Sequence, residues 1–356
     1  MSRVLQLIDS LEAGGAERLS VSFANVLADE AEASFLCVTR SEGILKATII
    51  ASVGYLFLEK QSSLDVKAIL KLRSFVKKNK INTIHAHSTS FFIATLVKII
   101  YPKVKLIWHD HYGQSEFIEQ RPKQILKFCS RFFSHIFCVN QNLVKWSQQN
   151  LICNSVCYLQ NFAILNDSEK TTELKGEEGK RILCLANLRP QKDHFTLLKA
   201  FEEVIKVHSD WTLHCVGKDF KDEYSNKVSQ YIKDNHLGNH IYSYGSCPDI
   251  KHILSQCEIG VLSSKSEGLP ISLLEYALAK LAVIATDVGN CDLIIDSDKI
   301  GSLINPNDKE ALKNAIIAYI ENKSERNVVA ENLYSHVVHN FSKEAVVETL
   351  LNVYHN

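Results

Sequence analysis

The stretch SSKSEGLPISLLEYALAKLAVIATDVGN, residues 263–290, contains a polar loop, a helix and a strand in close succession. Pro270 favours a helix start directly after the Glu267-Gly-Leu turn, and apolar residues continue to Ala279. The apolar run Ala282–Thr286 then predicts a buried strand, and a similar run, Ile259–Ser263, leads into the loop. Strand, helix and strand in this order predict two parallel strands joined by a crossover helix.

The same alternation extends over the whole chain. Further strands are expected at Val4–Ile8, Ala33–Thr39, Thr83–His87, Leu106–His109, His135–Val139, Arg181–Ala186, Thr212–Val216 and His240–Ser243. Helices are expected at Ala16–Ala28, Leu64–Asn79, His194–His208, Tyr224–Asn235, Lys309–Asn322 and Ser342–Tyr354. Because 356 residues exceed what one core usually organises, each half is predicted to be a doubly wound α/β domain.

The segment Asn166–Lys180 separates the halves by its composition. It holds five acidic and three basic residues with a single leucine, so a solvated linker or loop is expected there. The predicted organisation is an N-terminal domain over residues 1–165, this linker over 166–180, a C-terminal domain over 181–340 and a last helix within 341–356.

The net charge of zero is a cancellation between the halves. Residues 1–165 hold 19 basic and 12 acidic residues, and the remainder holds 21 basic and 28 acidic residues. Basic residues gather in Lys67–Lys80 and Arg121–Arg131, and amphipathic basic helices with aromatics suit an anionic membrane surface, although solvated helix faces have a similar composition. No nucleic-acid-binding motif accompanies the charge, so nucleic acid is not an expected partner.

Cysteine usage and the apolar runs predict a compartment. Ten cysteines without a small-domain pattern indicate reduced thiols, and Met1–Asp9 lacks the regions of a signal peptide. The longest apolar stretch, Phe91–Tyr101, is interrupted by Lys98 and is too short to span a bilayer. These features predict a cytoplasmic protein.

Three loops carry residues suited to binding a charged, hydroxyl-rich ligand. After the first strand, Gly14-Gly15 permits a tight turn whose amides can face an anion, or is simply a glycine turn. Arg189 and Lys192 follow another strand and could bind a diphosphate, although a solvated basic loop would look similar. Glu267 and Glu275 could bind hydroxyls of two different rings of a ligand. Alternatively, Glu267 could favour a helix N-terminus and Glu275 could lie on a solvated helix face.

Four histidines form two H-x-H pairs, His85 with His87 and His109 with His111. Each pair can point to one face of a strand. Zinc binding is one interpretation, but both pairs fall near strand ends, where they could equally line a cleft or cap a strand. No metal site is therefore predicted.

These segments together resemble the retaining, Leloir-type glycosyltransferases of family four, which have the GT-B fold, over nearly the whole chain. The most specific element is the E-x7-E motif, met by Glu267 and Glu275 within residues 266–290. The Gly14–Arg18 turn and the loop around Arg189 and Lys192 are similar to the family's glycine and diphosphate loops. Many members have Gly-Arg where this chain has Ala186-Asn187, and two glycines and a Glu in place of Val288–Asp292.

The resemblance implies two Rossmann-like domains facing across a cleft, with the C-terminal helix crossing back to the first domain. Donor-binding roles would belong to the residues that match the family's motifs, namely Gly15, Arg189, Lys192, Glu267, Gly268, Leu269, Pro270 and Glu275. Arg189 and Lys192 would neutralise the leaving diphosphate. Within Trp108–Gly113, His109 best matches a sugar-contacting catalytic histidine, and Asp110 or His111 would contact the acceptor or accept its proton.

The implied activity is metal-independent transfer of a hexose-type sugar from a UDP- or GDP-sugar with retention of configuration. The acceptor would be a saccharide or a polyprenyl-linked saccharide in cell-surface polysaccharide assembly, with the enzyme peripheral on the inner face of the membrane. No cofactor is expected. Two alternatives remain open: a GT-B sugar-nucleotide epimerase, and a non-catalytic nucleotide-sugar-binding partner.

Overall fold

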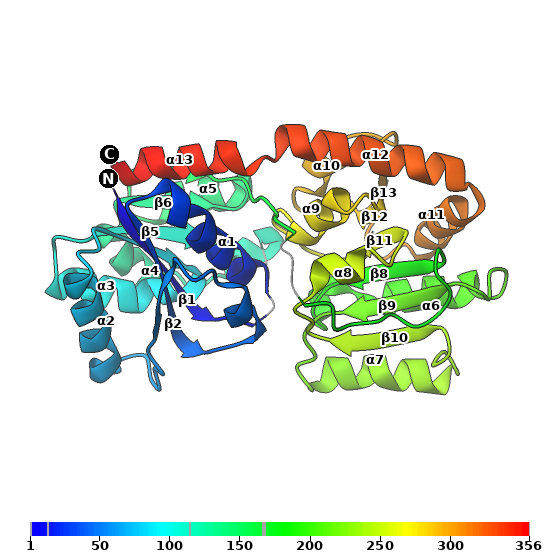
Figure 1. Cartoon of the computed structure of the whole chain (residues 1–356), viewed down its shortest axis with the longest axis horizontal. Coiled ribbons are helices and arrows are strands. Elements are labelled where there is room, and N and C mark those ends of the chain that lie inside the picture. The colour runs from blue at the N-terminus through cyan, green and yellow to red at the C-terminus, as the bar shows by residue number, and fades with distance from the viewer. Residues whose placement is uncertain (1, 13, 114, 166–168, 356) are drawn as a thin grey trace. The chain divides into compact units, whose positions relative to one another are not determined.

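The computed structural model describes residues 2–12, 14–113, 115–165 and 169–355. The chain forms two compact units, one of Met1–Phe162 with Lys343–Asn356 and one of Ala163–Ser342. The chain thus changes unit close to the expected boundary at residue 165 and returns to the first unit for its last helix (Figure 1).

The first unit is built on a seven-stranded sheet with the order β3-β2-β1-β4-β5-β6-β7. All neighbouring strands pair in parallel, and the order reverses direction between β1 and β4. The strands are β1 (Arg3–Ser10), β2 (Ala33–Ser41), β3 (Gly54–Phe57), β4 (Thr83–His87), β5 (Lys105–Asp110), β6 (His135–Cys138) and β7 (Val156–Tyr158).

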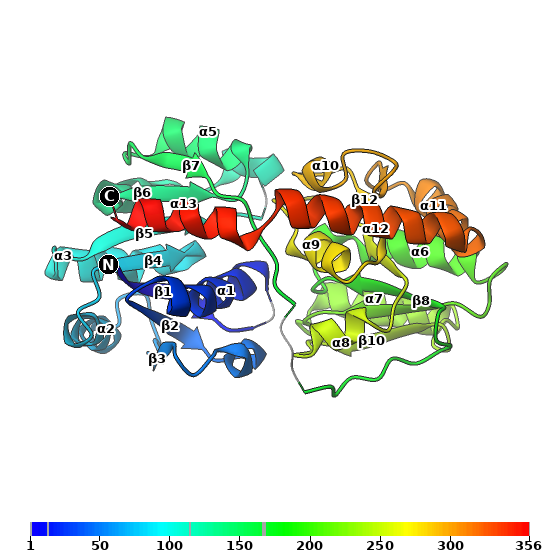
Figure 2. The same cartoon turned by 45° about the horizontal axis from the view of Figure 1, so that its top comes forward.

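Alternation along the strands sorts side chains onto two differently covered faces. Leu5 and Leu7 of β1 join an apolar core with α2 (Val66–Lys78), α3 (Phe91–Ile100), α4 (Gln124–Cys129) and α5 (Gln141–Asn150). The opposite face carries Gln6 and the histidines, beneath α1 (Gly15–Glu30) and α13 (Lys343–His355). Figure 2 shows α13, in red, beside α1, in blue.

The second unit has a six-stranded parallel sheet with the order β10-β9-β8-β11-β12-β13. Its strands are β8 (Arg181–Leu185), β9 (Thr212–Val216), β10 (Ile241–Gly245), β11 (Ile259–Leu262), β12 (Ala282–Thr286) and β13 (Ser302–Ile304). One apolar core includes side chains of α8 (Ile250–Leu254), α9 (Ile271–Leu278) and α10 (Cys291–Ile294). The other includes α6 (His194–Val204), α7 (Glu223–Asp234) and α11 (Lys309–Glu321), and α12 (Lys323–Asn340) contributes to both.

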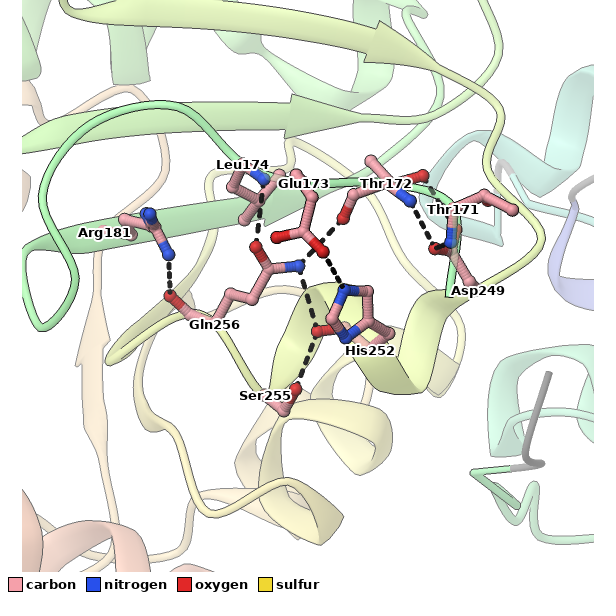
Figure 3. A network of polar contacts seen from close by, with 9 residues as sticks. All are labelled: Thr171, Thr172, Glu173, Leu174, Arg181, Asp249, His252, Ser255 and Gln256. Carbon is pink, nitrogen blue, oxygen red and sulfur yellow. Dashed lines mark hydrogen bonds and ion pairs between the residues drawn. The ribbon is translucent and has the colours of Figure 1, made fainter. Parts of the chain in front are cut away.

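The expected linker is a mostly exposed loop in its described part, and one of its side chains, Leu174, is buried in the second unit. Residues 166–168 lie outside the described part of the chain, and the described remainder forms neither helix nor strand. Leu174 is 5% exposed and belongs to the core. Figure 3 shows how the flanking backbone is held: the amides of Thr171 and Thr172 donate to Asp249 Oδ2 at 2.8 and 2.7 Å, and the Leu174 amide donates to Gln256 Oε1 at 2.9 Å. Leu174 and the hydrogen bonds to Asp249 and Gln256 thus attach this charged segment to the second unit.

Some elements have no clear sequence pattern. The strands β3, β7 and β13 have only three or four residues each, with partly buried side chains, which is too short for a clear strand pattern. The helix α12 contacts α9, α10, α11 and β12, and contacts on several sides remove the single apolar stripe that predicts a helix. Within the described residues, no helix combines the length and the apolar character needed to cross a bilayer.

Replacing Leu174 with alanine tests the docking of this segment. Because the side chain is buried in the core, Leu174→Ala should lower the free energy of unfolding by about 2–4 kcal/mol. Glu178→Ala, an exposed position in the same segment, should change it by less than about 0.5 kcal/mol. Urea titration followed by circular dichroism measures both, and equal effects would contradict the docking.

The buried histidines predict acid sensitivity. Burial lowers the pKa of His85, His87 and His109 well below the ordinary value and lowers the pKa of His111 to about 3. The unfolded chain binds protons below about pH 6.5, whereas these rings stay neutral in the fold. Stability is therefore complete above pH 6.5 and decreases as the pH falls toward the folded pKa values.

We expect the free energy of unfolding to decrease between pH 7 and pH 5, by up to about 1.4 kcal/mol per pH unit for each such histidine. Urea titrations at several pH values measure this slope. His85→Gln should reduce it, whereas the same slope in the variant and the parent would contradict the assignment.

Candidate functional site

The loops that follow β8 and β11 meet where the strand order of the second unit reverses. β8 continues to β9 and β10 on one side, whereas β11 continues to β12 and β13 on the other. Because all these strands are parallel, the loops at their carboxyl ends lie at one edge of the sheet. In open α/β sheets this switch point is the usual place for a ligand.

Lys192 and Glu267 form an ion pair at this edge. Lys192 Nζ lies 2.6 Å from Glu267 Oε1, and the same oxygen accepts a hydrogen bond from Ser264 Oγ at 2.6 Å. The Glu267 side chain is 9% exposed and the Lys192 side chain is 20% exposed. A partly desolvated, charge-assisted contact of this kind orients both groups more firmly than a surface pair would.

Hydrogen bonds between the two loops hold this pair in place. Ser263 Oγ donates to the carbonyl oxygens of Lys192 and Asp193, and the Lys265 amide donates to Gln191 O at 2.7 Å. Lys265 Nζ also lies 3.3 Å from Asp193 Oδ1. The position of Lys192 is therefore set by backbone contacts on both sides of its side chain.

Gly289 packs against the backbone of the Glu267 loop. Its φ of +61° is in the left-handed region, and a Cβ there would lie 2.2 Å from Glu267 O. The amide of Asn290 donates to Gly268 O at 2.8 Å. Gly289 thus allows the backbone of the Val288–Asp292 segment to lie close to the backbone of the Glu267 loop.

Pro270 lacks an N–H, so within Gly268–Pro270 only Gly268 and Leu269 have amide donors.

Arg189 lies apart from the ion pair and is exposed. Its guanidinium carbon is 4.4 Å from the centroid of Phe220, and Lys218 Nζ is 5.3 Å from the same ring. Asn187 Oδ1 accepts a hydrogen bond from the Lys218 amide at 2.7 Å, so Asn187 has a structural contact here. The Phe220 ring gathers two cations at this edge.

Glu275 is 6% exposed within the second turn of α9. The next residue, Tyr276, is fully buried, and its hydroxyl accepts a hydrogen bond from the Leu185 amide at 2.6 Å. Gly260 of β11 makes room for that ring, since a Cβ at this position would lie 2.6 Å from it. This contact joins α9, and with it Glu275, to the end of β8.

The arrangement suits a ligand that is both anionic and rich in hydroxyl groups. Arg189, Lys192 and Lys218 supply positive charge from the loops after β8 and β9, while Glu267 and Glu275 supply carboxylates. Guanidinium and ammonium groups bind phosphate oxygens, and buried carboxylates accept hydrogen bonds from hydroxyls.

In the first unit, Gly15 is the first residue of α1, and Gly14 caps the helix without a side-chain bond. This turn follows β1, next to β4 at the point where that strand order reverses. The helix N-terminus therefore lies at the carboxyl edge of the sheet, as the glycine turn predicts.

Asp110 forms a buried ion pair with Arg121. It is 1% exposed, and Arg121 binds it through two nitrogens, at 2.6 and 2.9 Å. The Arg121 guanidinium also lies against Tyr112 and Trp146, with centroid distances of 4.4 and 4.7 Å. Arg121 is therefore an internal residue and not part of an exposed basic face.

The structure separates the remaining candidates of that loop by burial. His109 is fully buried, and within the described part of the chain neither of its ring nitrogens has a hydrogen-bond partner. His111 is half-buried, and its Nε2 lies 3.0 Å from His87 Nδ1. His111 is therefore the more accessible of the two rings.

Several functional candidates were not found from the sequence. No motif identifies these residues in the sequence, because each is a common residue type in a loop after a strand; they are Ser264, Lys218, Phe220 and Gly289. Their contacts become visible only when adjacent strands bring separate loops together.

Two family models match the chain, one over each half. The model "Glycosyltransferase Family 4" matches residues 13–158, and "Glycosyl transferases group 1" matches residues 166–336.

Among curated relatives, a lipopolysaccharide core biosynthesis mannosyltransferase of Rhizobium leguminosarum bv. viciae is 28% identical over 51% of this chain and 52% of its own length. The match to that relative thus spans about half of each protein. A UDP-Gal:alpha-D-GlcNAc-diphosphoundecaprenol alpha-1,3-galactosyltransferase of Escherichia coli is 23% identical over 82% of this chain and 79% of its own.

Solved structures share the fold at low identity. Anabaena HepE in complex with UDP and glucose has a TM-score of 0.81 and 18% identity, covering 99% of both chains. A mutant of Staphylococcus aureus TarM in complex with UDP has a TM-score of 0.80 and 12% identity, covering 100% of both. With the two family models and the two parallel-sheet units, these likenesses show that the chain belongs to the GT-B glycosyltransferases of family four.

Proposed function

We propose that this glycosyltransferase moves a hexose-type sugar from a UDP- or GDP-sugar to a saccharide or polyprenyl-linked saccharide, with retention of anomeric configuration. The Lys192–Glu267 pair at the switch point of the second unit carries the proposal. It places an ammonium group and a carboxylate where a diphosphate and its sugar would lie next to each other.

Lys192 and Arg189 would stabilise the charge that develops on the diphosphate as the glycosidic bond breaks. Glu267 would bind a hydroxyl of the donor sugar, Glu275 would bind the ribose hydroxyls, and the amides of Gly268 and Leu269 would assist. Gly15 would allow the backbone to approach the diphosphate. These two cations would make a divalent metal unnecessary, so we expect no cofactor.

The three candidates in the first unit's loop differ in accessibility. Asp110 is paired with Arg121 and His109 is fully buried, so the side chains of both are enclosed. His111 is the better candidate for a hydrogen bond to sugar or acceptor. Because burial lowers its pKa to about 3, it would act as a neutral donor or acceptor at pH 7.

The relatives support an acceptor in cell-surface assembly. One relative's name gives a diphosphoundecaprenol-linked acceptor, and another's gives lipopolysaccharide core synthesis. All ten cysteines are described and unpaired, which fits action in the reducing cytoplasm.

We also propose that the face formed by α2, α3 and α4 docks on an anionic membrane surface. The helices α2 and α4 each pack on α3. Exposed large apolar side chains lie on these helices and two residues before α2, at Leu64, Val66, Leu70, Ile99, Ile100, Ile125 and Phe128. Exposed cations accompany them at Lys67, Lys71, Lys77, Lys78, Lys123, Lys127 and Arg131. Cations among apolar side chains suit a headgroup interface.

Removing either member of the ion pair should abolish most transfer. Lys192→Ala and Glu267→Ala should each lower kcat by about 10²-fold or more, because each removes a contact to charge or sugar in the transition state. The assay contains EDTA and follows nucleotide release and product, and NMR of the product gives its anomeric configuration.

Lys199→Ala is the matched control, since Lys199 is an exposed lysine on α6 and takes no part in the contacts of the ion pair described above. It should retain transfer, and all variants should keep the parent's circular dichroism spectrum. Near-parent turnover in both Lys192→Ala and Glu267→Ala, or an inverted product, would contradict the proposal. Epimerised donor without acceptor, or nucleotide binding without turnover, would favour the two alternative functions.

Membrane docking predicts a dependence on anionic lipid. Flotation with phosphatidylcholine vesicles should recover more protein when phosphatidylglycerol is included, and Lys127→Glu with Phe128→Ser should reduce that recovery several-fold at low salt. Lys233→Glu, on α7 of the second unit, should have no effect. Equal recovery from both vesicle types would contradict this docking face.

A further inference from the structure

Four histidines lie together beneath α1 and α13 on one face of the first unit's sheet. His85 and His87 are in β4, His109 is in β5, and His111 follows it. The parallel register pairs His87 with His109, and ring centroids within the group lie 4.1–5.5 Å apart. Phe23 of α1 packs against three of the rings.

The hydrogen bonds of this cluster define which nitrogens are available. His87 Nε2 lies 2.8 Å from Gln6 Oε1, and because an amide oxygen only accepts, Nε2 carries the proton. His87 Nδ1 therefore holds a lone pair, and it lies 3.0 Å from His111 Nε2. His85 Nδ1 lies 2.7 Å from the hydroxyl of Tyr354 on α13. Gln6 Nε2 donates to the same hydroxyl at 3.4 Å; when the hydroxyl oxygen also accepts from His85 Nδ1, His85 Nε2 offers a lone pair. Such outer hydrogen bonds are what orient histidine ligands in metal sites.

Three nitrogens in the cluster are buried and have no partner among the described residues: His85 Nε2 and both ring nitrogens of His109. His85, His87 and His109 are each 0% exposed. Buried polar atoms without a hydrogen bond are costly and uncommon, so this group calls for an occupant. One nitrogen from each of the three rings lies within 4.8 Å of the other two.

We propose that His85, His87 and His109 form a binding site for a transition-metal ion of the zinc class. Imidazole nitrogen suits such ions and does not suit Mg²⁺ or Ca²⁺, which prefer oxygen. In a tetrahedral zinc site, neighbouring ligand nitrogens lie about 3.3 Å apart. The ligand atoms, which lie within 4.8 Å of one another, would have to move closer to bind one ion.

Burial favours this role because it keeps the imidazoles neutral, which is the form that binds metal. The site would also hold α13 to the sheet, since the hydroxyl of Tyr354 bonds His85. The bound ion would thus stabilise the first unit.

The test measures metal in the full chain without substrate. The purified protein is incubated with Zn²⁺, passed over a desalting column and analysed by mass spectrometry for bound metal. We expect about one Zn²⁺ per chain, a rise in Tm with Zn²⁺, and far less metal in His109→Phe and His85→Gln. His214→Gln, which changes a buried histidine of the other sheet, should retain the ion.

Cobalt distinguishes this site from cysteine ligation. Co²⁺ in the histidine cluster should give d–d absorption without the thiolate charge-transfer band that cysteine ligands produce. The two variants His109→Phe and His85→Gln are tested separately, and a melting curve recorded without metal checks that each variant is folded. No retained Zn²⁺ in the parent, equal content in His109→Phe and the parent, or a thiolate band would overturn the proposal.

Discussion

Parallel strand pairing is the constraint on which both units depend. A parallel strand is covered on both faces, and each strand needs a crossover before the next can pair with it. Both sheets meet this requirement with helices on each side, and both reverse their strand order once. The carboxyl ends of the strands then lie at one edge, where loops far apart in sequence become neighbours.

The donor-side loops show how that edge becomes a site. Lys192 and Glu267 are 75 positions apart in the chain, yet they meet because β8 and β11 are adjacent strands. Backbone contacts between their loops, and the close approach of Gly289, hold the pair before any ligand arrives. The hydroxyl of Tyr276 on α9 hydrogen-bonds to the backbone of both β8 and β11. The helix that carries Glu275 is therefore anchored to the same two strands whose loops carry Lys192 and Glu267.

The first unit uses its two sheet faces differently. One face has an apolar core that includes Trp108 and Trp146, with the Arg121–Asp110 pair beside it. The other face buries histidines and Gln6 beneath α13, which joins this unit after the chain has formed the second one. Buried nitrogens of this kind need hydrogen-bond partners, and Tyr354 and Gln6 provide partners for His85 and His87.

The sequence by itself determined the α/β class, most of the central strands and the identity of the polar residues at their ends. Those features are local, since the period of apolar residues reports which face of an element is buried, and strands β9 and β12 begin and end at the predicted residues. Tertiary structure alone decided the burial of Leu174, the pairing of Asp110 with Arg121 and the separation of His109 from His111 by exposure. These outcomes depend on strand order and on which helix covers each face, and no local pattern encodes a contact between residues that only the packed sheet brings together.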